Sequence, residues 1–365
     1  MDIAGGPWEP SDACAAERHT SSSARGEVTP ELFATGAGTE SAPFTSRDGL
    51  AGFGEALLTL SRSRGGVAVV GTGRYDVTSL SGIPLNTPAL GIVGRIPGFN
   101  IDPNGEAEGT IGGKIRCSGT CITFNPAGGA KIGGLVAQNL YLWSAAGKSA
   151  TYYGLYFPNC TDQPNVERIN ISNFGYAVYV AGAGTVDAGN FTRLSLLNNT
   201  YGLYFSDGSV YGYSKVIASE FSDNDSVGIY VGTSTHPWLK LLGNTVVRDA
   251  RASGLANIVL RGGGAILSDN VIRDAGHNMV ASTYRAADCV LVQSDGNLIV
   301  GNWIGDCTQG AAVHVSGNSN QVIANRFSGN SVDVLLDPGS SGNLVVVPDG
   351  TNVVDKGTSN RIVRQ

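Results

Sequence analysis

The stretch Asn297–Asn330 reads NLIVGNWIGDCTQGAAVHVSGNS followed by NQVIANRFSGN, and it holds one pattern twice. In each copy an Asn is followed two residues later by an aliphatic residue, then three residues later by a second Asn, and then two residues later by another apolar residue. The second Asn is Asn302 in the first copy and Asn325 in the other, an offset of 23 residues. Self-similarity at such a period is typical of a solenoid, in which each repeat packs only against its neighbours.

The pattern extends back through the chain when its second apolar position is taken as an anchor. The anchors are Leu142, Ile171, Leu197, Phe221, Val246, Ile272, Ile304 and Phe327. Two residues before the anchors lies a column that starts apolar and ends in Asn244, Asn270, Asn302 and Asn325. Because an inward Asn can donate to the Asn of the next rung, this column predicts stacked rungs whose buried amides pair with one another.

A second strand follows in each rung, usually after a Gly. Because side chains alternate between the two faces of a strand, its aliphatic residues are expected to point inward and its middle residue outward. The outward column contains Tyr156, Tyr179, Tyr204 and Tyr230, and then Val259, Leu291, His314 and Leu335. Tyrosines stacked at roughly 4.8 Å form either a platform for the apolar faces of sugar rings or an apolar strip that packs against another subunit. For the second case we hypothesise a homotrimer about the solenoid axis.

The composition is that of a folded, turn-rich β protein. Glycine accounts for 52 of 365 residues and charged residues for 15%, which excludes a disordered chain. The net charge of −6, without a block of Lys or Arg, argues against a nucleic-acid partner, and no segment is long enough to span a membrane. No signal peptide is visible in the first 30 residues. We therefore expect an extracellular protein that is either secreted after removal of a leader or carried on a virus particle.

The cysteines and histidines do not form a metal-binding pattern. Cys117 and Cys121 flank a Ser-Gly-Thr turn, which suits either a local disulfide or buried thiols. No two further ligands stand near this pair, and the four His residues are scattered along the chain. We predict no metal site.

The periodicity predicts one solenoid domain. Residues 1–30 show no periodicity and are interpreted as an irregular N-terminal arm, and residues 31–365 as a single parallel β-helix domain. Within it we expect a cap over 31–77, rungs over about 78–345 and short C-terminal strands over 346–365. Apolar residues at helical spacing between Leu50 and Leu60 predict a short helix that covers the open first rung.

Two motifs near the N-terminus resemble the opening segment of pectate-lyase-like right-handed parallel β-helix proteins. The first motif matches at Phe33, Ala34, Thr35, Gly36, Gly38 and Thr39, and the second at Gly65, Gly66, Val67, Val69, Gly73, Tyr75 and Val77. The family's paired Asp after the Gly-Thr, and its Pro before the Gly-x-Tyr, are absent here. The resemblance covers roughly residues 31–345 and implies an all-β, right-handed parallel β-helix, a fold whose function depends on the residues grafted onto it.

The longest gap between anchors, 32 residues, points to an inserted loop. It lies between Ile272 and Ile304, and the extra residues fall within Ala275–Asp288. Insertions in solenoids emerge on one face, often the binding face. The chemistry-bearing residues of this loop are His277, Tyr284, Arg285 and Asp288. They belong either to a substrate-binding loop or to a solvated loop.

Acidic residues follow the anchors in three consecutive rungs. The column is Asn173, Asn199, Asn224, Asp249, Asp274, Asp306 and Asn330, and Arg248 and Arg273 precede two of the acids. Carboxylates on neighbouring rungs would lie roughly 5 Å apart, which raises one pKa and suits a general acid beside a base or nucleophile. The other interpretation is a turn ladder in which the arginines neutralise the acids.

These features predict a protein that cleaves a polysaccharide, as a glycoside hydrolase or polysaccharide lyase, in the manner of a phage tailspike depolymerase. The candidate catalytic residues are Asp249, Asp274, Asp306, His277 and Arg273. Hydrolysis needs no cofactor, whereas elimination needs a base and a cation such as Ca²⁺ to neutralise a uronate. The alternatives are a non-catalytic glycan-binding adhesin or structural spike, and an enzyme of the fructotransferase or epimerase type that rearranges a glycan.

Overall fold

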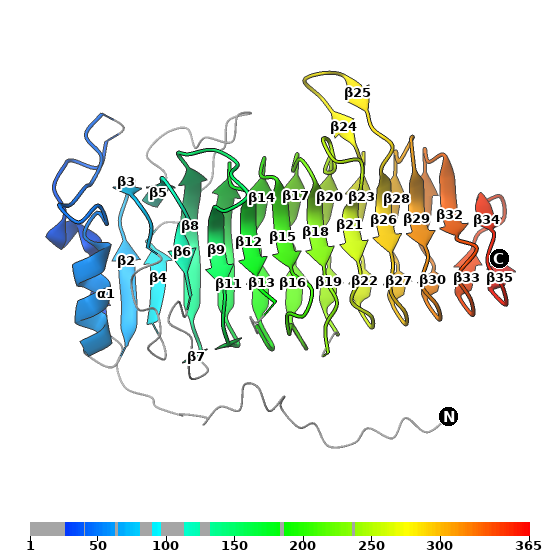
Figure 1. The fold of residues 1–365 in the computed structure, drawn as a ribbon, viewed down its shortest axis with the longest axis horizontal. Helices are drawn as coiled ribbons and strands as arrows, with labels where there is room; N and C mark the ends of the chain where they lie inside the picture. Colours follow the sequence, from blue (N-terminus) through cyan, green and yellow to red (C-terminus); the bar gives the residue numbers. More distant parts are fainter. Residues whose placement is uncertain are drawn as a thin grey trace, which may run out of the picture.

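The structure, a computed structural model, describes residues 26–39, 41–62, 65–80, 90–95, 113–124, 132–182, 186–235 and 238–365. Over these residues the chain coils into a parallel β-helix whose rungs stack along one long axis (Figure 1). Each regular rung contributes one strand to each of three faces, which we name the first row, the second row and the front sheet. The predicted right-handed parallel β-helix is confirmed.

The front sheet is one continuous parallel stack. Its strands, in order, are β6 (Ile122–Thr123), β9 (Tyr153–Phe157), β12 (Tyr176–Val180), β15 (Tyr201–Phe205), β18 (Val227–Val231), β21 (Ala256–Leu260), β26 (Asp288–Val292), β29 (Ala311–Val315), β32 (Val332–Leu336) and β34 (Val353–Asp355). Neighbouring strands pair in register, so residues at equivalent positions form straight columns along the axis.

The first and second rows share two long strands, β8 (Val136–Ser144) and β11 (Asn165–Ser172), which pass from one row to the other. The other strands of the first row are β1 (Gly26–Val28), β2 (Gly66–Val70), β4 (Leu90–Gly94), β13 (Asn190–Thr192), β16 (Lys215–Ile217), β19 (Lys240–Leu242), β22 (Ile266–Ser268), β27 (Leu298–Val300), β30 (Gln321–Ile323), β33 (Leu344–Val347) and β35 (Arg361–Arg364). The other strands of the second row are β3 (Gly73–Val77), β5 (Gly113–Cys117), β14 (Ser195–Leu197), β17 (Glu220–Ser222), β20 (Thr245–Val247), β23 (Val271–Arg273), β28 (Trp303–Gly305) and β31 (Arg326–Ser328).

Short elements lie outside these stacks. The helix α1 (Phe53–Arg62) follows the 3-10 turn η2 (Pro30–Phe33) and buries Phe53, Leu57 and Leu60 against the first rungs. The predicted capping helix is thus present, although it begins at Phe53 rather than at Leu50. Two small pairs complete the structure, β7 (Ile132–Gly133) with β10 (Thr161–Asp162), and β24 (His277–Asn278) with β25 (Thr283–Tyr284).

The predicted asparagine column lies inside the solenoid, as expected. The side-chain amide of Asn244 donates to Oδ1 of Asn270, Asn270 donates to Asn302, and Asn302 to Asn325, each at 2.9 Å. These side chains are buried, and each donor and acceptor that a buried amide leaves unpaired costs free energy. The ladder therefore satisfies polar groups that the stacking of rungs would otherwise leave without partners.

A second ladder runs along the turn before the first row. Asn297 donates to Asn320 at 2.9 Å, Asn320 to Asn343 at 3.2 Å, and Asn343 to Asn360 at 3.0 Å. The two copies of the opening pattern are the rungs in which both ladders run side by side. The repeat of 23 residues is thus explained by two asparagines that each bond to their counterparts in the next rung.

Two disulfides lie within the described residues. They join Cys117 to Cys121 and Cys289 to Cys307, so the local disulfide was the correct interpretation of the first pair. Residues 1–25 of the predicted arm lie outside the described residues, and Gly26–Val28 pairs with the first row. Among the described residues, no helix has both the length and the apolar character of a membrane span.

Candidate functional site

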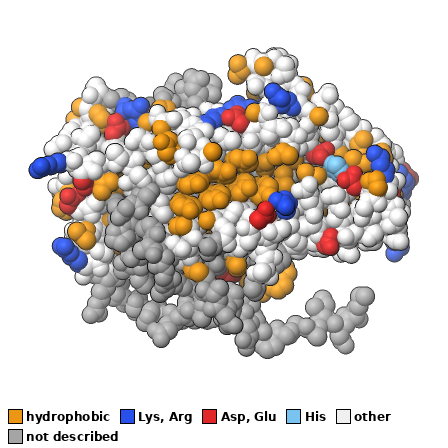
Figure 2. All heavy atoms as spheres, viewed as in Figure 1, with side chains coloured by type: hydrophobic (Ala, Val, Ile, Leu, Met, Phe, Trp, Pro, Cys, Tyr) orange, Lys and Arg blue, Asp and Glu red, His pale blue; other side chains and the backbone are white. Residues whose placement is uncertain are grey.

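The front sheet carries an aromatic surface that is larger than the predicted column. Tyr156, Tyr179, Tyr204 and Tyr230 are register partners on successive strands, as predicted. A second column begins three residues earlier, with Tyr153, Tyr176 and Tyr201 also in register. We name these seven tyrosines of the described front strands the tyrosine face. Figure 2 shows a broad hydrophobic band along the middle of the molecule.

The rings of the tyrosine face contact one another, and several neighbouring pairs are stacked. The centroids of Tyr204 and Tyr230 lie 4.3 Å apart with an interplanar angle of 5°, and those of Tyr176 and Tyr201 lie 4.7 Å apart at 8°. All seven side chains are partly exposed. Burial and the neighbouring phenols raise the pKa of Tyr176 to about 12, so its hydroxyl group stays neutral and can both donate and accept hydrogen bonds.

Toward the C-terminus the same face becomes aliphatic. Val227, Ala256 and Val259 form a small buried cluster against which Tyr201, Tyr230 and Leu291 pack. This continuation was predicted at Val259 and Leu291, and it extends the apolar band beyond the tyrosines.

Charged groups frame both edges of the tyrosine face. Where the front strands end, Arg261 donates from Nη1 to the hydroxyl of Tyr230 and pairs with Asp207, both at 2.8 Å. Where the front strands begin, Asp225 forms ion pairs with Lys148 at 2.8 Å and with Arg251 at 2.7 Å. Burial lowers the pKa of Lys148. At the edge where the front strands begin, two cationic side chains therefore share the carboxylate of Asp225.

The predicted acid column is wrong, because it combines two adjacent columns. Residues in the left-handed conformation form an outer column that includes Asp223, Arg248, Asp274 and Asp306. Asp249 stands one position further along the chain and belongs to an inner column, where it accepts from the backbone and side-chain amides of Asn224. It is fully buried, and burial raises its pKa to about 8. Asp249 is therefore out of reach of a substrate on the surface.

The arginines of the column neutralise acids, as the structural interpretation expected, but with different partners. Arg248 pairs with Asp223 at 2.9 Å. Arg273 pairs with Asp306, with 2.9 Å from Nε to Oδ2, and its guanidinium lies over the ring of Trp303. Asp274, by contrast, makes no hydrogen bond or ion pair through its side chain with any described residue.

The predicted loop is confirmed as a projection from the solenoid. It forms the β24–β25 hairpin, which rises above the stack in Figure 1. The rings of His277 and Tyr284 stack at 4.2 Å and 4°, and Arg285 donates to the backbone oxygen of Arg251 at 3.1 Å. The pKa of Tyr284 is raised by burial and by Asp274 and Asp306. The hairpin thus lies near the two surface acids.

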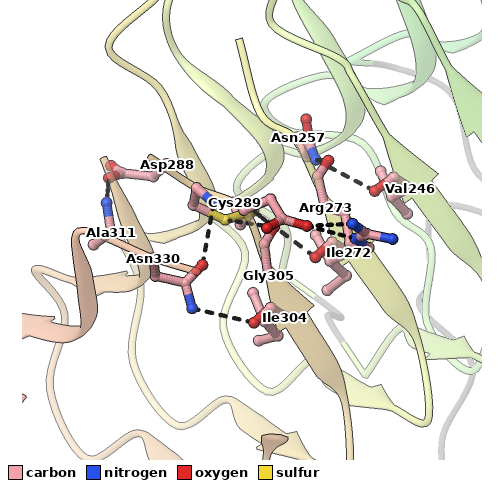
Figure 3. Close-up of a disulfide and its surroundings, with 12 residues drawn as sticks. Val246, Asn257, Ile272, Arg273, Asp288, Cys289, Ile304, Gly305, Ala311 and Asn330 are labelled. Carbon is pink, nitrogen blue, oxygen red and sulfur yellow. Dashed lines mark hydrogen bonds and ion pairs between the residues drawn. A yellow bond between two sulfur atoms is a disulfide. The ribbon is translucent and has the colours of Figure 1, made fainter. Parts of the chain in front are cut away.

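Asp288 is not part of this loop. It begins β26, where Oδ1 accepts from the backbone amide of Ala311 at 2.7 Å and Oδ2 lies 2.8 Å from Nδ1 of His314. Figure 3 shows Asp288 beside the Cys289 disulfide, and the side-chain amide of Asn330 donating to the backbone oxygen of Ile304 on the neighbouring rung. Apart from the four predicted tyrosines of the front sheet, the candidate residues therefore fall into three groups: Arg273, Asp274, His277, Tyr284, Arg285 and Asp306 near the hairpin, Asp288 with His314, and Asp249 inside.

Sequence reasoning missed the second tyrosine column for a specific reason. Strict alternation from Tyr156 places Tyr153 on the inner face. The front strands instead carry two consecutive buried residues between their two tyrosines, so the alternation is broken there. The signal was nonetheless present, since Tyr-x-x-Tyr recurs at Tyr153, Tyr176 and Tyr201.

The family described as "Periplasmic copper-binding protein (NosD)" matches residues 133–356, which is more than half of the chain and covers most of the rungs. The chain belongs to the NosD family. No curated protein matches it in sequence.

Solved structures similar to this NosD-family chain are β-helix proteins. The Geobacillus virus E2 protein ORF18 has a TM-score of 0.59 and 14% identity over 93% of this chain, which spans 61% of the viral protein. The A-module of mannuronan C-5 epimerase AlgE6 from Azotobacter vinelandii has a TM-score of 0.56 and 15% identity, covering 92% of this chain and 99% of the module. DFA-IIIase from Arthrobacter chlorophenolicus A6, without its lid and in complex with GF2, has a TM-score of 0.60 and 13% identity, covering 93% of this chain and 99% of the DFA-IIIase chain. At these identities the similarity shows the fold alone.

The described residues of this NosD-family chain do not fit a copper site. Among them, no group of three or more His, Cys, Asp or Glu is placed to hold a metal ion. Copper is bound by imidazole, thiolate and thioether groups. The ring of His277 is stacked on Tyr284, His314 lies between carboxylates, and the thiols of Cys289 and Cys307 are joined in a disulfide.

Proposed function

We propose that this protein binds a polysaccharide along the tyrosine face and cleaves it beside the β24–β25 hairpin. The observation that carries the proposal is the tyrosine face itself, with its stacked, partly exposed rings and hydrogen-bonding groups at both edges. Sugar rings present apolar faces to aromatic rings and hydroxyl groups to polar side chains, so the surface matches both parts of a glycan. The epimerase and DFA-IIIase among the similar structures support a carbohydrate ligand.

The reactive groups proposed are Asp274 and Asp306, which occupy neighbouring rungs of the outer column. Their backbones are therefore separated by roughly 4.8 Å. Arg273 pairs with Asp306, while the side chain of Asp274 makes no hydrogen bond or ion pair with a described residue. In hydrolysis Asp274 would act as the general acid or base and Asp306 as the second carboxylate. In an elimination, Tyr284 or His277 would take the proton and Arg285 or Arg273 would neutralise a uronate.

The test is a screen of the purified protein against capsular, pectic, alginate and fructan polysaccharides, reading reducing ends and the ultraviolet absorbance of unsaturated uronates. Asp274→Asn should abolish the signal with the fold intact, while Asp349→Asn, an exposed acid away from the hairpin, should not. Reducing ends alone indicate hydrolysis and both signals indicate a lyase. New linkages without new ends indicate rearrangement. Binding without turnover would leave an adhesin, and neither binding nor turnover would refute the proposal.

The periplasmic description of the NosD family supports action outside the cytoplasm, and we propose secretion or display on a virus particle. A second candidate function is favoured by the partly exposed rings of the tyrosine face and by Leu291, which continues their column, because an exposed apolar strip suits a subunit interface. We propose a homotrimer for that case. Light scattering distinguishes the glycan-binding surface from the subunit interface, because a monomer in dilute solution leaves the tyrosine face open to a glycan.

A further inference from the structure

The phenol rings of the tyrosine face form one connected network that runs across four rungs. Measured between ring centroids, Tyr176 lies 5.6 Å from Tyr153 on the preceding rung and 4.7 Å from Tyr201 on the following rung. Tyr204 lies 5.1 Å from Tyr201 and 4.3 Å from Tyr230. Each ring of the tyrosine face thus contacts at least one other ring of the face.

Two pairs of tyrosines on neighbouring rungs are nearly parallel. Tyr176 and Tyr201 are register partners with an interplanar angle of 8°. Tyr204 and Tyr230 are register partners with an angle of 5°. Such stacking places the ring carbons next to the hydroxyl group, the ortho carbons, beside the ring of the other phenol. The pairs are held together because their backbones belong to paired strands roughly 4.8 Å apart.

The tyrosine face is accessible to an oxidant and has no thiol to compete with it. All seven side chains are partly exposed, so a proton that leaves a phenol can pass to water. No cysteine in the described part of the chain is free. A free thiol is readily oxidised and would return a hydrogen atom to a phenoxyl radical. An oxidised ring of the tyrosine face therefore meets other phenols first.

We propose that the tyrosine face is a site of oxidative cross-linking, in which a peroxidase with hydrogen peroxide joins tyrosines of neighbouring rungs as dityrosine. Each phenol gives up one electron and its hydroxyl proton and becomes a phenoxyl radical. Two radicals combine by forming a bond between their ortho carbons, and the hydrogen on each of these carbons then moves to the oxygen and restores the phenol. The two electrons and two protons released reduce one hydrogen peroxide to two waters.

The pairs that couple are Tyr176 with Tyr201 and Tyr204 with Tyr230, because these are the nearly parallel pairs on neighbouring rungs. Each cross-link ties one rung to the next. A covalent bond between residues one repeat apart restricts the unfolded chain and so stabilises the folded one. The inference goes beyond the proposed function and does not depend on it, since the reaction needs only the tyrosines and the oxidant.

The experiment treats the purified full chain with a peroxidase and hydrogen peroxide at low protein concentration, where coupling within one molecule outpaces coupling between molecules. Trypsin, which cleaves after Lys and Arg, then yields the tyrosines of successive front strands on the peptides 149–168, 169–193, 194–215 and 216–240. Mass spectrometry should find the second peptide joined to the third and the third joined to the fourth, with two hydrogen atoms lost at each bond. The treated chain should remain a monomer on a denaturing gel and show dityrosine fluorescence.

Two variants test the geometry. Tyr204→Phe keeps the ring and removes the phenol that lies beside Tyr230, so it should abolish the bond between the third and fourth peptides and leave the other bond in place. Tyr284→Phe is the matched control, because this exposed ring stacks on His277 and not on a phenol, and it should leave both bonds unchanged.

A further readout is stability, since the cross-linked parent should unfold at a higher urea midpoint than the untreated parent. Dityrosine only between molecules, a cross-link to Tyr230 that survives in Tyr204→Phe, or the absence of dityrosine overturns the inference.

Discussion

Asn224 donates both its backbone amide and its side-chain amide to the same oxygen of Asp249, each at 2.8 Å. The other oxygen of this carboxyl is buried and has no hydrogen-bond partner among the described residues. Asn224 and Asp249 are the last two members of a short inner ladder that begins at Asn199. The ladder ends there because the equivalent position on the next rung is Ala275, whose side chain cannot form a hydrogen bond. An acid thus stands where the preceding rungs have amides, and its burial raises its pKa to about 8.

The first prediction concerns stability and pH. The pKa of Asp249 in the folded protein, about 8, exceeds the value of about 3.9 expected in the unfolded chain. Between these values the folded state holds a proton that the unfolded state has lost, so the contribution to stability is full below about pH 4 and is lost as the pH rises toward 8. Asp249→Asn should be more stable than the parent at pH 8 and equal to it near pH 4. Urea unfolding of both proteins at the two pH values measures their free energies of unfolding. A difference in this free energy between parent and variant that does not change with pH would contradict the prediction.

The second prediction concerns the long asparagine ladder. Oδ1 of Asn302 accepts from the backbone and side chain of Asn270, and its own amide donates to Asn325. Asn302→Ala leaves these buried groups without partners and should reduce the free energy of unfolding by about 2–4 kcal/mol. The control Gln321→Ala changes an exposed side chain of the same rungs and should have an effect within about 0.5 kcal/mol. Equal effects would show that the ladder adds nothing to stability.

The third prediction separates aromatic stacking from hydrogen bonding on the tyrosine face. Tyr204 contacts the rings of Tyr176, Tyr179, Tyr201 and Tyr230. Tyr204→Ala should weaken glycan binding about tenfold, or roughly 1.4 kcal/mol, whereas Tyr204→Phe keeps the ring and should lose less. Calorimetry with the polysaccharide found in the screen measures both. Equal binding by all three proteins would place the glycan elsewhere.

The fourth prediction concerns the edge where the front strands end. Arg261 forms an exposed ion pair with Asp207 and orients the hydroxyl of Tyr230. Since exposed ion pairs contribute little to stability, Arg261→Ala should change the free energy of unfolding by less than about 1 kcal/mol while lowering glycan affinity about threefold. Arg193→Ala, an exposed arginine on another face, is the matched control. A loss of stability without a change in affinity would make Arg261 structural.

The parts of the fold that repeat were predictable from the sequence, because a repeated environment selects the same residue type in each rung. Asn302 and Asn325 show the clearest case, since both occupy one inward position and bond to one another. The stacking of Tyr204 on Tyr230 followed in the same way from strand alternation. These predictions needed only a period and a rule for which side chains face inward.

The parts that depend on one turn residue were not predictable. The turn before each front strand contains one residue in the left-handed conformation, followed by one that points inward, and both positions favour Asn and Asp. Residue type could therefore not show that Asp274 stands in the first position and Asp249 in the second. The contacts of His314 with Asp288 and Asp337 were hidden for a different reason, since the three residues come from separate rungs and none belongs to a repeated column of its own type.

The straight register of the tyrosine face has a consequence for how a ligand would move. A glycan that shifts by one rung meets another pair of tyrosines in register, so neighbouring positions along the axis offer it the same kinds of contact. Such a surface permits sliding in one dimension and does not by itself select a starting point. The repeat is broken where tyrosines give way to Val259 and where His314 enters the column. These interruptions, rather than the regular rungs, would determine where a sliding chain stops.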